Sequence, residues 1–167
     1  MTGPVALELE GFSAYYGAMA AVREVSLRVE RGSAVGILGP NGAGKSTLLM
    51  GAAGFLRCSG GVALGGRDAA RLSPVRRRRA GLALVPQQQA VVAGLSPKLI
   101  GELVDAIRTM NDRGLTVLLV EQNVSVVERT CERLHVLNGG QVVWDGETTS
   151  IDRDRIGDLY AGFGESR

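Results

Sequence analysis

The sequence predicts an α/β fold with a mainly parallel sheet and a small antiparallel β portion. Continuous apolar runs at Ala34–Leu38, Leu82–Val85 and Thr116–Val120 are typical of strands that a parallel sheet buries on both faces. Segments with helical spacing follow these runs, which favours alternating strands and helices. Near the N-terminus, apolar and acidic residues alternate instead, as in a strand with one exposed face. The length of 167 residues is that of one domain.

The individual elements follow from local periodicity and turn residues. We expect amphipathic strands at Leu7–Phe12 and Val25–Val29 before the first buried strand. The remaining elements are expected to be a helix at Ser46–Phe55, a short strand at Val62–Leu64, helices at Pro97–Arg113, Val124–Glu132 and Ile151–Tyr160, and a hairpin of His135–Leu137 with Gln141–Trp144. Gly114 follows the long helix as a C-terminal cap.

Composition excludes several classes of function. The net charge is only +2, and the basic run Arg76–Arg79 has no interleaved aromatic residues, so we expect a solvated helix face and no nucleic-acid partner. The cysteines Cys58 and Cys131 lie far apart, which argues against a zinc site. No apolar run reaches the length of about 18 residues that a membrane span needs, and the first ten residues lack the basic segment of a secretory signal. These features predict a cytoplasmic protein or one face of a larger assembly.

One motif carries specific chemistry. Residues Gly39–Ser46 match GxxxxGK(S/T) at every fixed position, between a buried strand and a helix. Glycines in this context let backbone N–H groups converge on phosphate oxygens, next to the positive end of the helix. Lys45, one of two lysines in the chain, is expected to reach the outer phosphates of ATP, and the Ser46 hydroxyl to bind Mg²⁺. The nucleotide-binding residues predicted here are Gly39, Pro40, Asn41, Gly42, Ala43, Gly44, Lys45, Ser46 and Thr47.

Around this motif the chain resembles the ATP-binding subunits of ABC transporters, most closely those of branched-chain amino-acid importers. The resemblance rests on LGPNGAGKSTLL, LALVPQ, AGLSPKL, LTVLLVEQN and VLNGGQVV, which occur in the order found in that family and extend from Val5 to about Gly146. It implies a P-loop NTPase-type fold, ATP and Mg²⁺ as cofactors, and two kinds of partner: membrane permease subunits and a second ATP-binding subunit. It also implies a cytoplasmic location on the inner face of the cell membrane.

The resemblance assigns roles to three further residues. Tyr16 matches an aromatic residue that stacks on adenine, although a loop aromatic without this role is an alternative. Gln87 matches a glutamine that approaches Mg²⁺ and contacts the membrane subunit, and a plain polar loop residue is the alternative. Gln122 occupies the position of the family's switch histidine, where the branched-chain group also carries glutamine. The only histidine, His135, falls on a predicted strand and is expected to be structural.

A large block of the family pattern is missing. The helical subdomain, the LSGGQ signature and the Walker B strand with its acidic end should lie between Gln87 and Ala93, which are only six positions apart. No Asp or Glu occurs from Ala69 to Gly101, so no catalytic residue is expected to be intact. Glu121 ends an apolar strand and is the one substitute acid, although it aligns with the switch strand. We also predict that Leu82–Val85 pairs with Thr116–Val120 in the vacant place.

Two functions remain open after these observations. The first is the energy-coupling, ATP-binding subunit of an ABC importer, formed by a single shortened domain over residues 1–167 that has lost hydrolysis. The second is a non-hydrolysing nucleotide-binding module, or the product of an internally deleted gene. A P-loop kinase is disfavoured because no second substrate site or basic lid is evident.

Overall fold

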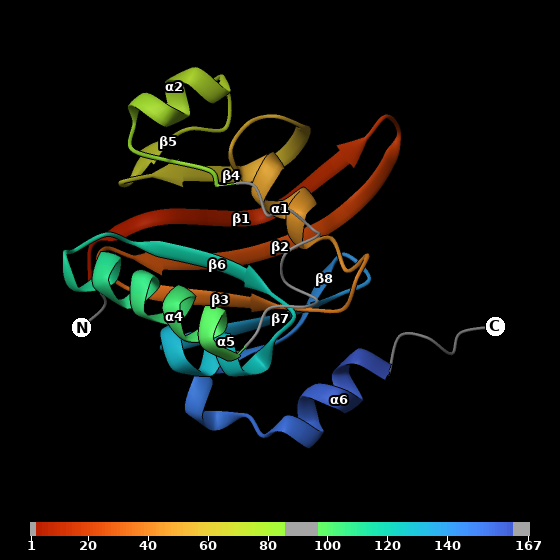
Figure 1. The fold of residues 1–167 in the computed structure, drawn as a ribbon. Helices are drawn as coiled ribbons and strands as arrows, with labels where there is room; N and C mark the ends of the chain where they lie inside the picture. Colours follow the sequence, from red (N-terminus) through yellow and green to blue (C-terminus); the bar gives the residue numbers. More distant parts are fainter. Residues whose placement is uncertain (1–2, 86–96, 162–167) are drawn as a thin grey trace.

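The computed structural model describes residues 3–85 and 97–161, which form two sheets and the helices around them (Figure 1). The first sheet is antiparallel, in the order β2-β1-β4-β5. The second has the order β6-β3-β7-β8, in which β6, β3 and β7 are parallel and β8 is antiparallel. The strands are β1 (Val5–Tyr16), β2 (Met19–Glu30), β3 (Ala34–Leu38), β4 (Arg57–Leu64), β5 (Arg67–Asp68), β6 (Val117–Glu121), β7 (Arg133–Asn138) and β8 (Gln141–Glu147). This is the predicted α/β architecture with an antiparallel portion.

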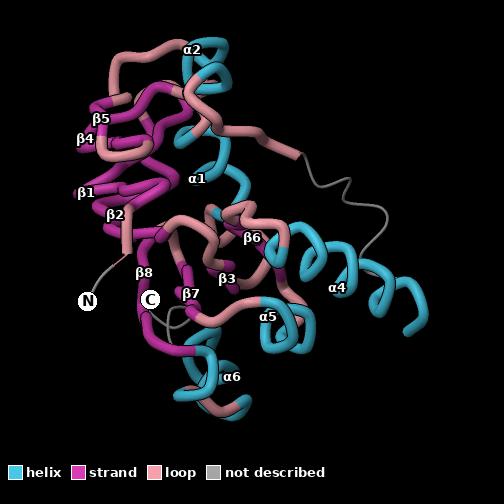
Figure 2. The backbone as a smooth tube through the Cα atoms, turned by 90° about the vertical axis from the view of Figure 1, so that its left-hand side faces the viewer, coloured by secondary structure: helices cyan, strands magenta, loops and turns pink. Residues whose placement is uncertain are grey.

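Helices lie on both sides of the parallel sheet (Figure 1). The helices are α1 (Lys45–Ala52), α2 (Pro74–Arg79), α4 (Pro97–Asp112), α5 (Val124–Thr130) and α6 (Arg153–Ala161), with a 3-10 turn at Thr148–Ser150. Of these, α2 lies beside the antiparallel sheet, near the end of α1. One apolar core lies between the two sheets and includes Phe12 and Leu48. A second core, around Leu134 and Ile156, lies where α5 and α6 cover the other face of the parallel sheet (Figure 2). The described residues hold no separate helical subdomain.

One predicted strand is wrong. Residues 82–85 form no strand, and within the described ranges β6 pairs only with β3, so the expected pairing of Leu82–Val85 with Thr116–Val120 does not occur. Val85 is 84% exposed instead of buried. The three residues Val117–Leu119 of β6 are only half-buried, as expected for a strand that pairs on one side only among the described residues. An apolar run adopts the strand conformation when a partner strand offers it hydrogen bonds, and no strand in residues 3–85 and 97–161 pairs with this run.

The basic helix also differs from its prediction. Arg76, Arg78 and Arg79 of α2 are exposed as expected, but Arg77 is 1% exposed. Its guanidinium donates four hydrogen bonds to backbone carbonyls, those of Gly51, Ala52, Ala70 and Leu72. Since Gly51 and Ala52 end α1, this buried cation fastens α2 to the helix that starts at the glycine-rich loop.

Candidate functional site

The glycine-rich loop joins the C-terminal end of β3 to the N-terminus of α1. All five residues of β3 are buried, which fixes the start of the loop in the centre of the parallel sheet. The loop then turns with positive φ at Gly42 (81°) and Gly44 (102°), a conformation that costs glycine little. The first helical hydrogen bond runs from Leu48 N to Gly44 O, at 2.8 Å. The N–H groups at the start of α1 are therefore available to an anion, as the sequence predicts.

Lys45 is buried at the base of this loop. Its Nζ donates hydrogen bonds to Gly39 O at 2.7 Å and to Pro40 O at 2.9 Å, so the side chain curls back over the loop that precedes it. Burial lowers the pKa of Lys45, and the nearby negative charge of Glu121 opposes that shift. An ammonium group held by two carbonyls can exchange these neutral acceptors for phosphate oxygens, which form stronger charge-assisted bonds.

The residues after Lys45 suit a magnesium-bound nucleotide. Ser46 is exposed at the start of α1, whereas Thr47 is buried. No group of three or more His, Cys, Asp or Glu side chains that could hold a metal ion by itself occurs in residues 3–85 and 97–161. The exposed Ser46 hydroxyl is an oxygen ligand of the kind that Mg²⁺ takes, and in nucleotide sites the phosphates and water complete the shell. Gln87, the second predicted ligand, lies outside the described residues.

A contact that the sequence did not predict holds the loop from the other side. The turn between β7 and β8 packs on it: Gly140 N donates to Ala43 O at 3.0 Å, and Arg23 N donates to Gly140 O at 2.8 Å. A Cβ atom at Gly140 would lie 2.5 Å from Ala21 O. The pair Gly139-Gly140 therefore does more than reverse the chain, because it connects the loop to β2. In the sequence the double glycine is the one signal of this contact, and by itself it predicts only a hairpin.

Tyr16 is the last residue of β1, at the tip of the β1–β2 hairpin. It pairs in register with Met19, and its side chain is 48% exposed. A little further along β2, Ala21 O would be 3.0 Å from a Cβ on Gly44, so this hairpin runs along the loop. Tyr16 is therefore an exposed aromatic residue on the hairpin whose second strand contacts the loop at Gly44.

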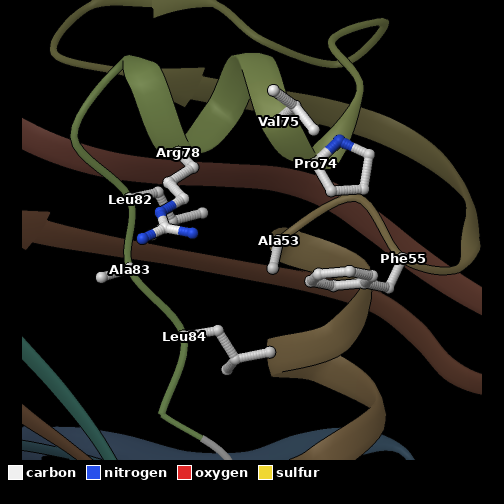
Figure 3. A pocket seen from close by; sticks show the side chains of 8 residues that line it. All are labelled: Ala53, Phe55, Pro74, Val75, Arg78, Leu82, Ala83 and Leu84. Carbon is white, nitrogen blue, oxygen red and sulfur yellow. The ribbon is translucent and has the colours of Figure 1, made fainter.

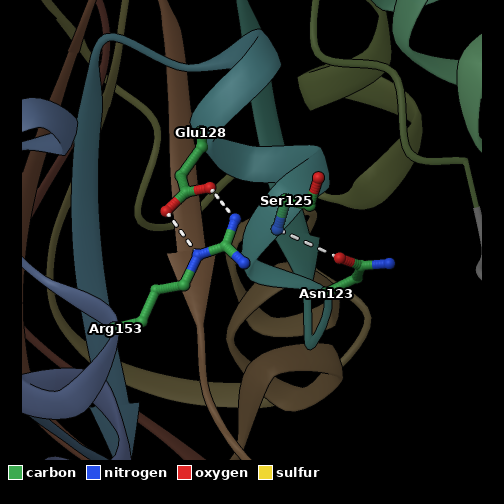
Figure 4. Close-up of polar contacts among 4 residues, drawn as sticks. All are labelled: Asn123, Ser125, Glu128 and Arg153. Carbon is green, nitrogen blue, oxygen red and sulfur yellow. Dashed lines mark hydrogen bonds and ion pairs between the residues drawn. The ribbon is translucent and has the colours of Figure 1, made fainter.

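The end of β6 supplies a second set of polar residues. Glu121 is 4% exposed, and its carboxylate accepts a hydrogen bond from Gln122 N at 3.2 Å. The Gln122 Nε2 donates to Asn41 Oδ1, so the predicted switch position contacts the phosphate loop directly. Asn123 caps α5, since its Oδ1 accepts from Ser125 N at 3.0 Å (Figure 4). In the same view Arg153 of α6 binds Glu128 of α5 at 2.6 Å, which ties the last helix to α5.

His135 has no place in this site. It is 3% exposed within β7, and neither ring nitrogen has a hydrogen-bond partner among the described residues. Burial lowers its pKa to about 4, with Asp145 raising it and Arg133 lowering it further. The ring is therefore neutral at pH 7, as in a structural core histidine.

An apolar groove of about 380 Å³ lies between the end of α1 and α2 (Figure 3). Its lining residues are Ala53, Phe55, Pro74, Val75, Arg78, Leu82, Ala83 and Leu84. Phe55 and Val75 are 59% and 60% exposed. The lining holds one cation, no carboxylate and no hydroxyl, and it lies at the end of α1 opposite the phosphate loop. It is not a second nucleotide site.

Comparison with known proteins agrees with this geometry. Residues 22–143, most of the chain, match the ABC transporter family. The chain belongs to the ABC transporter family. The ADP conformation of MJ1267, an ATP-binding cassette of an ABC transporter, superposes with a TM-score of 0.75 at 18% identity, covering 94% of this chain and 95% of that chain. The fold is therefore that of an ABC ATP-binding cassette.

Relatives of this ABC protein serve different substrates. A probable ABC transporter ATP-binding protein of Azorhizobium caulinodans is 35% identical over 125 residues, 72% of this chain but only 44% of that protein. The high-affinity branched-chain amino acid transport ATP-binding protein BraG of Pseudomonas aeruginosa is 23% identical over 231 residues, covering 93% of this chain and 99% of BraG. The lipopolysaccharide export system protein LptB of Acidithiobacillus ferridurans is 24% identical over 232 residues, covering 93% and 96%.

The alignments with BraG and LptB span 231 and 232 positions, more than the 167 residues of this chain. Both relatives therefore contain residues that have no counterpart here. Among residues 3–85 and 97–161, no helix is long and apolar enough to cross a membrane.

Proposed function

We propose that this chain is the ATP-binding, energy-coupling subunit of an ABC transporter and that residues Gly39–Thr47 hold the phosphates of MgATP. The observation that carries the proposal is the buried Lys45 at the start of a helix, whose Nζ, among the described residues, hydrogen-bonds only neutral carbonyls of its own loop. Ser46 is exposed where the metal would lie, and Gln87 is the second proposed ligand. Mg²⁺ would supply charge neutralisation at the outer phosphates.

Calorimetric titration of MgATP tests this site. Lys45→Ala is expected to abolish most of the binding, because it removes the one buried cation of the loop. Lys98→Ala is the matched control, since Lys98 is the only other lysine and lies exposed on α4. It is expected to bind like the wild type. Equal affinities of wild type and Lys45→Ala would refute the phosphate site.

The adenine would stack on Tyr16. Its exposed ring at the tip of the hairpin whose second strand contacts the loop supports this role. Tyr16→Ala should then weaken the binding of ATP, by an amount typical of one stacked base, about 1–3 kcal/mol. Binding of inorganic tripolyphosphate, which has no base, should stay unchanged. A parallel loss for both ligands would assign Tyr16 to the loop structure instead.

The transported substrate that we propose is a branched-chain amino acid. The glutamine at position 122 and the near-complete coverage of BraG support it, while LptB is covered almost as fully. The partners would be membrane permease subunits and a second ATP-binding subunit, on the inner face of the cell membrane. Co-expression with any permease genes found next to its own gene, followed by co-purification from membranes and uptake of labelled leucine, tests both statements. Co-purification with permeases that move only another substrate would overturn the amino-acid assignment.

A second candidate is a non-hydrolysing nucleotide-binding module formed by residues 1–167 as a single shortened domain. The observation in its favour is that only 17 residues, 80–96, separate α2 from α4, and they contain no Asp or Glu. Co-purification with membrane permease subunits distinguishes the two candidates, since only the first requires such partners.

A further inference from the structure

Glu121 lies at the edge of the parallel sheet where the phosphate loop begins. In the parallel ladder between β3 and β6 it is the register partner of Leu38, the residue directly before Gly39. Parallel strands end at the same edge of their sheet, so the register places Glu121 beside the start of the loop. The hydrogen bond from Gln122 to Asn41 fixes this end of β6 against the loop.

This carboxyl group is buried without an ion pair. Glu121 is the only Asp or Glu among the buried residues of the described ranges, and within those ranges no cationic nitrogen lies within 4 Å of it. Burial raises its pKa, while hydrogen bonds from the backbone of Gln122 and Asn123 and the charge of Lys45 lower it. The charge of this carboxylate is only partly compensated by its neighbours. It therefore interacts electrostatically with any charged ligand that binds at the start of the loop.

We propose that Glu121 makes the phosphate loop select magnesium-bound ATP over metal-free ATP. The proposal rests on the function proposed above and assigns this residue a part in its specificity. Metal-free ATP is a tetra-anion near neutral pH, and MgATP is a dianion. A fixed negative charge therefore repels the metal-free form about twice as strongly, and it attracts a cation bound on the phosphates. The repulsion acts in a partly desolvated place, where water screens it poorly.

The experiment measures ATP affinity of the full chain twice, in excess EDTA and in excess Mg²⁺, for four proteins. Glu121→Gln keeps the shape and removes the charge, and Glu121→Asp keeps the charge. Glu147→Gln is the matched control, because Glu147 is exposed at the β8 end that pairs with Arg133, away from the loop. We expect Glu121→Gln to bind metal-free ATP roughly tenfold more tightly than wild type. Its preference for MgATP should fall by at least that factor, while Glu121→Asp and Glu147→Gln keep the preference.

An unchanged ratio of the two affinities in Glu121→Gln overturns the inference while leaving ATP binding in place. Loss of Lys45-dependent ATP binding in the wild type overturns the proposed function, and the inference with it. The wild type alone gives a further test that does not require any variant to fold: it must bind MgATP at least roughly tenfold more tightly than metal-free ATP. Equal affinities in the wild type refute the proposal directly.

Discussion

Arg77 Nη1 donates a hydrogen bond of 2.7 Å to Ala52 O, the carbonyl that ends the helix after the phosphate loop. The same guanidinium binds Gly51 O, Leu72 O and Ala70 O, at 2.9 to 3.1 Å. Helix C-termini carry partial negative charge and unpaired carbonyls, and a planar fork of donors satisfies several of them at once. Arg77 therefore anchors α1, and through α1 the position of Lys45 at its other end.

We expect Arg77→Lys to destabilise the protein by about 2–4 kcal/mol, since one ammonium cannot reach all four carbonyls and leaves buried acceptors unpaired. Arg78→Lys, at an exposed position of the same helix, should change stability by less than about 0.5 kcal/mol. Urea denaturation measures the change in the free energy of unfolding for both variants, provided that the m-value stays unchanged. Equal midpoints for the two variants would show that the Arg77 hydrogen bonds contribute no net stability.

The turn at Gly140 gives a prediction on how the loop is held. Gly140 has φ 80°, and an added Cβ would collide with Ala21 O, so Gly140→Ala should cost at least about 2 kcal/mol and weaken MgATP binding. Gly66→Ala is the control: φ is 77° there as well, but the space around it is open. It should cost only about 1–2 kcal/mol and leave nucleotide affinity unchanged. Chemical denaturation and ATP titration of both variants test this, and a Gly140→Ala protein that binds ATP normally would contradict it.

His135 predicts a dependence of stability on pH. Its pKa is about 4 in the folded state, below the usual value of 6.5, so the unfolded chain binds the extra proton between these values. The contribution of His135 to the free energy of unfolding is fully present above about pH 6.5. It is lost as the pH drops toward 4, by at most about 1.4 kcal/mol per pH unit. As the only histidine, His135 is the side chain expected to dominate this slope between pH 5 and 6.5. Denaturation of wild type and His135→Phe across this range measures it, and identical slopes would refute it.

Much of the fold could be predicted because its signals are local. The buried strand Ala34–Leu38 has the bounds that its apolar run predicts, and Asn138-Gly139-Gly140 correctly predicts the β7–β8 hairpin. The run Leu82–Val85 has the same composition as a buried strand and forms none. Strand formation depends on a partner far away in the sequence, and periodicity contains no information about that partner.

The same difference between local and long-range signals decides which parts of the candidate site could be predicted. The phosphate loop is a contiguous motif, so Lys45 and Ser46 could be found from the sequence alone. The contacts of Gly140 with Ala43 and of Gln122 with Asn41 join segments that are roughly 80–100 residues apart, and they depend on the order of strands in the sheet. Arg77 was missed for another reason: in a run of four arginines, only the rotation of α2 against α1 decides which one is buried.

The last prediction concerns turnover. By family resemblance, hydrolysis needs a signature segment from a second subunit above the phosphate loop, and an acid that polarises the attacking water. The sequence between Gln87 and Ala93 has room for neither. Loss of a general base costs about 10²–10⁴-fold in rate, and loss of charge stabilisation at the γ-phosphate costs more, because positioning and electrostatics supply nearly all of this catalysis.

We therefore expect the purified chain to bind MgATP through Lys45 without releasing phosphate above background. Glu121 does not change this expectation, because a buried carboxylate whose charge is partly balanced by Lys45 selects the metal-bound nucleotide but does not present a base to water. An intact partner subunit could restore only one composite site: its signature would face this chain's loop, which still lacks the acid, while its own loop would face no signature. The measurement is steady-state phosphate release, with Lys45→Ala as the blank. A Lys45-dependent rate of about one per second, the low end of ordinary enzyme turnover, would show that Glu121 or another group replaces the missing acid.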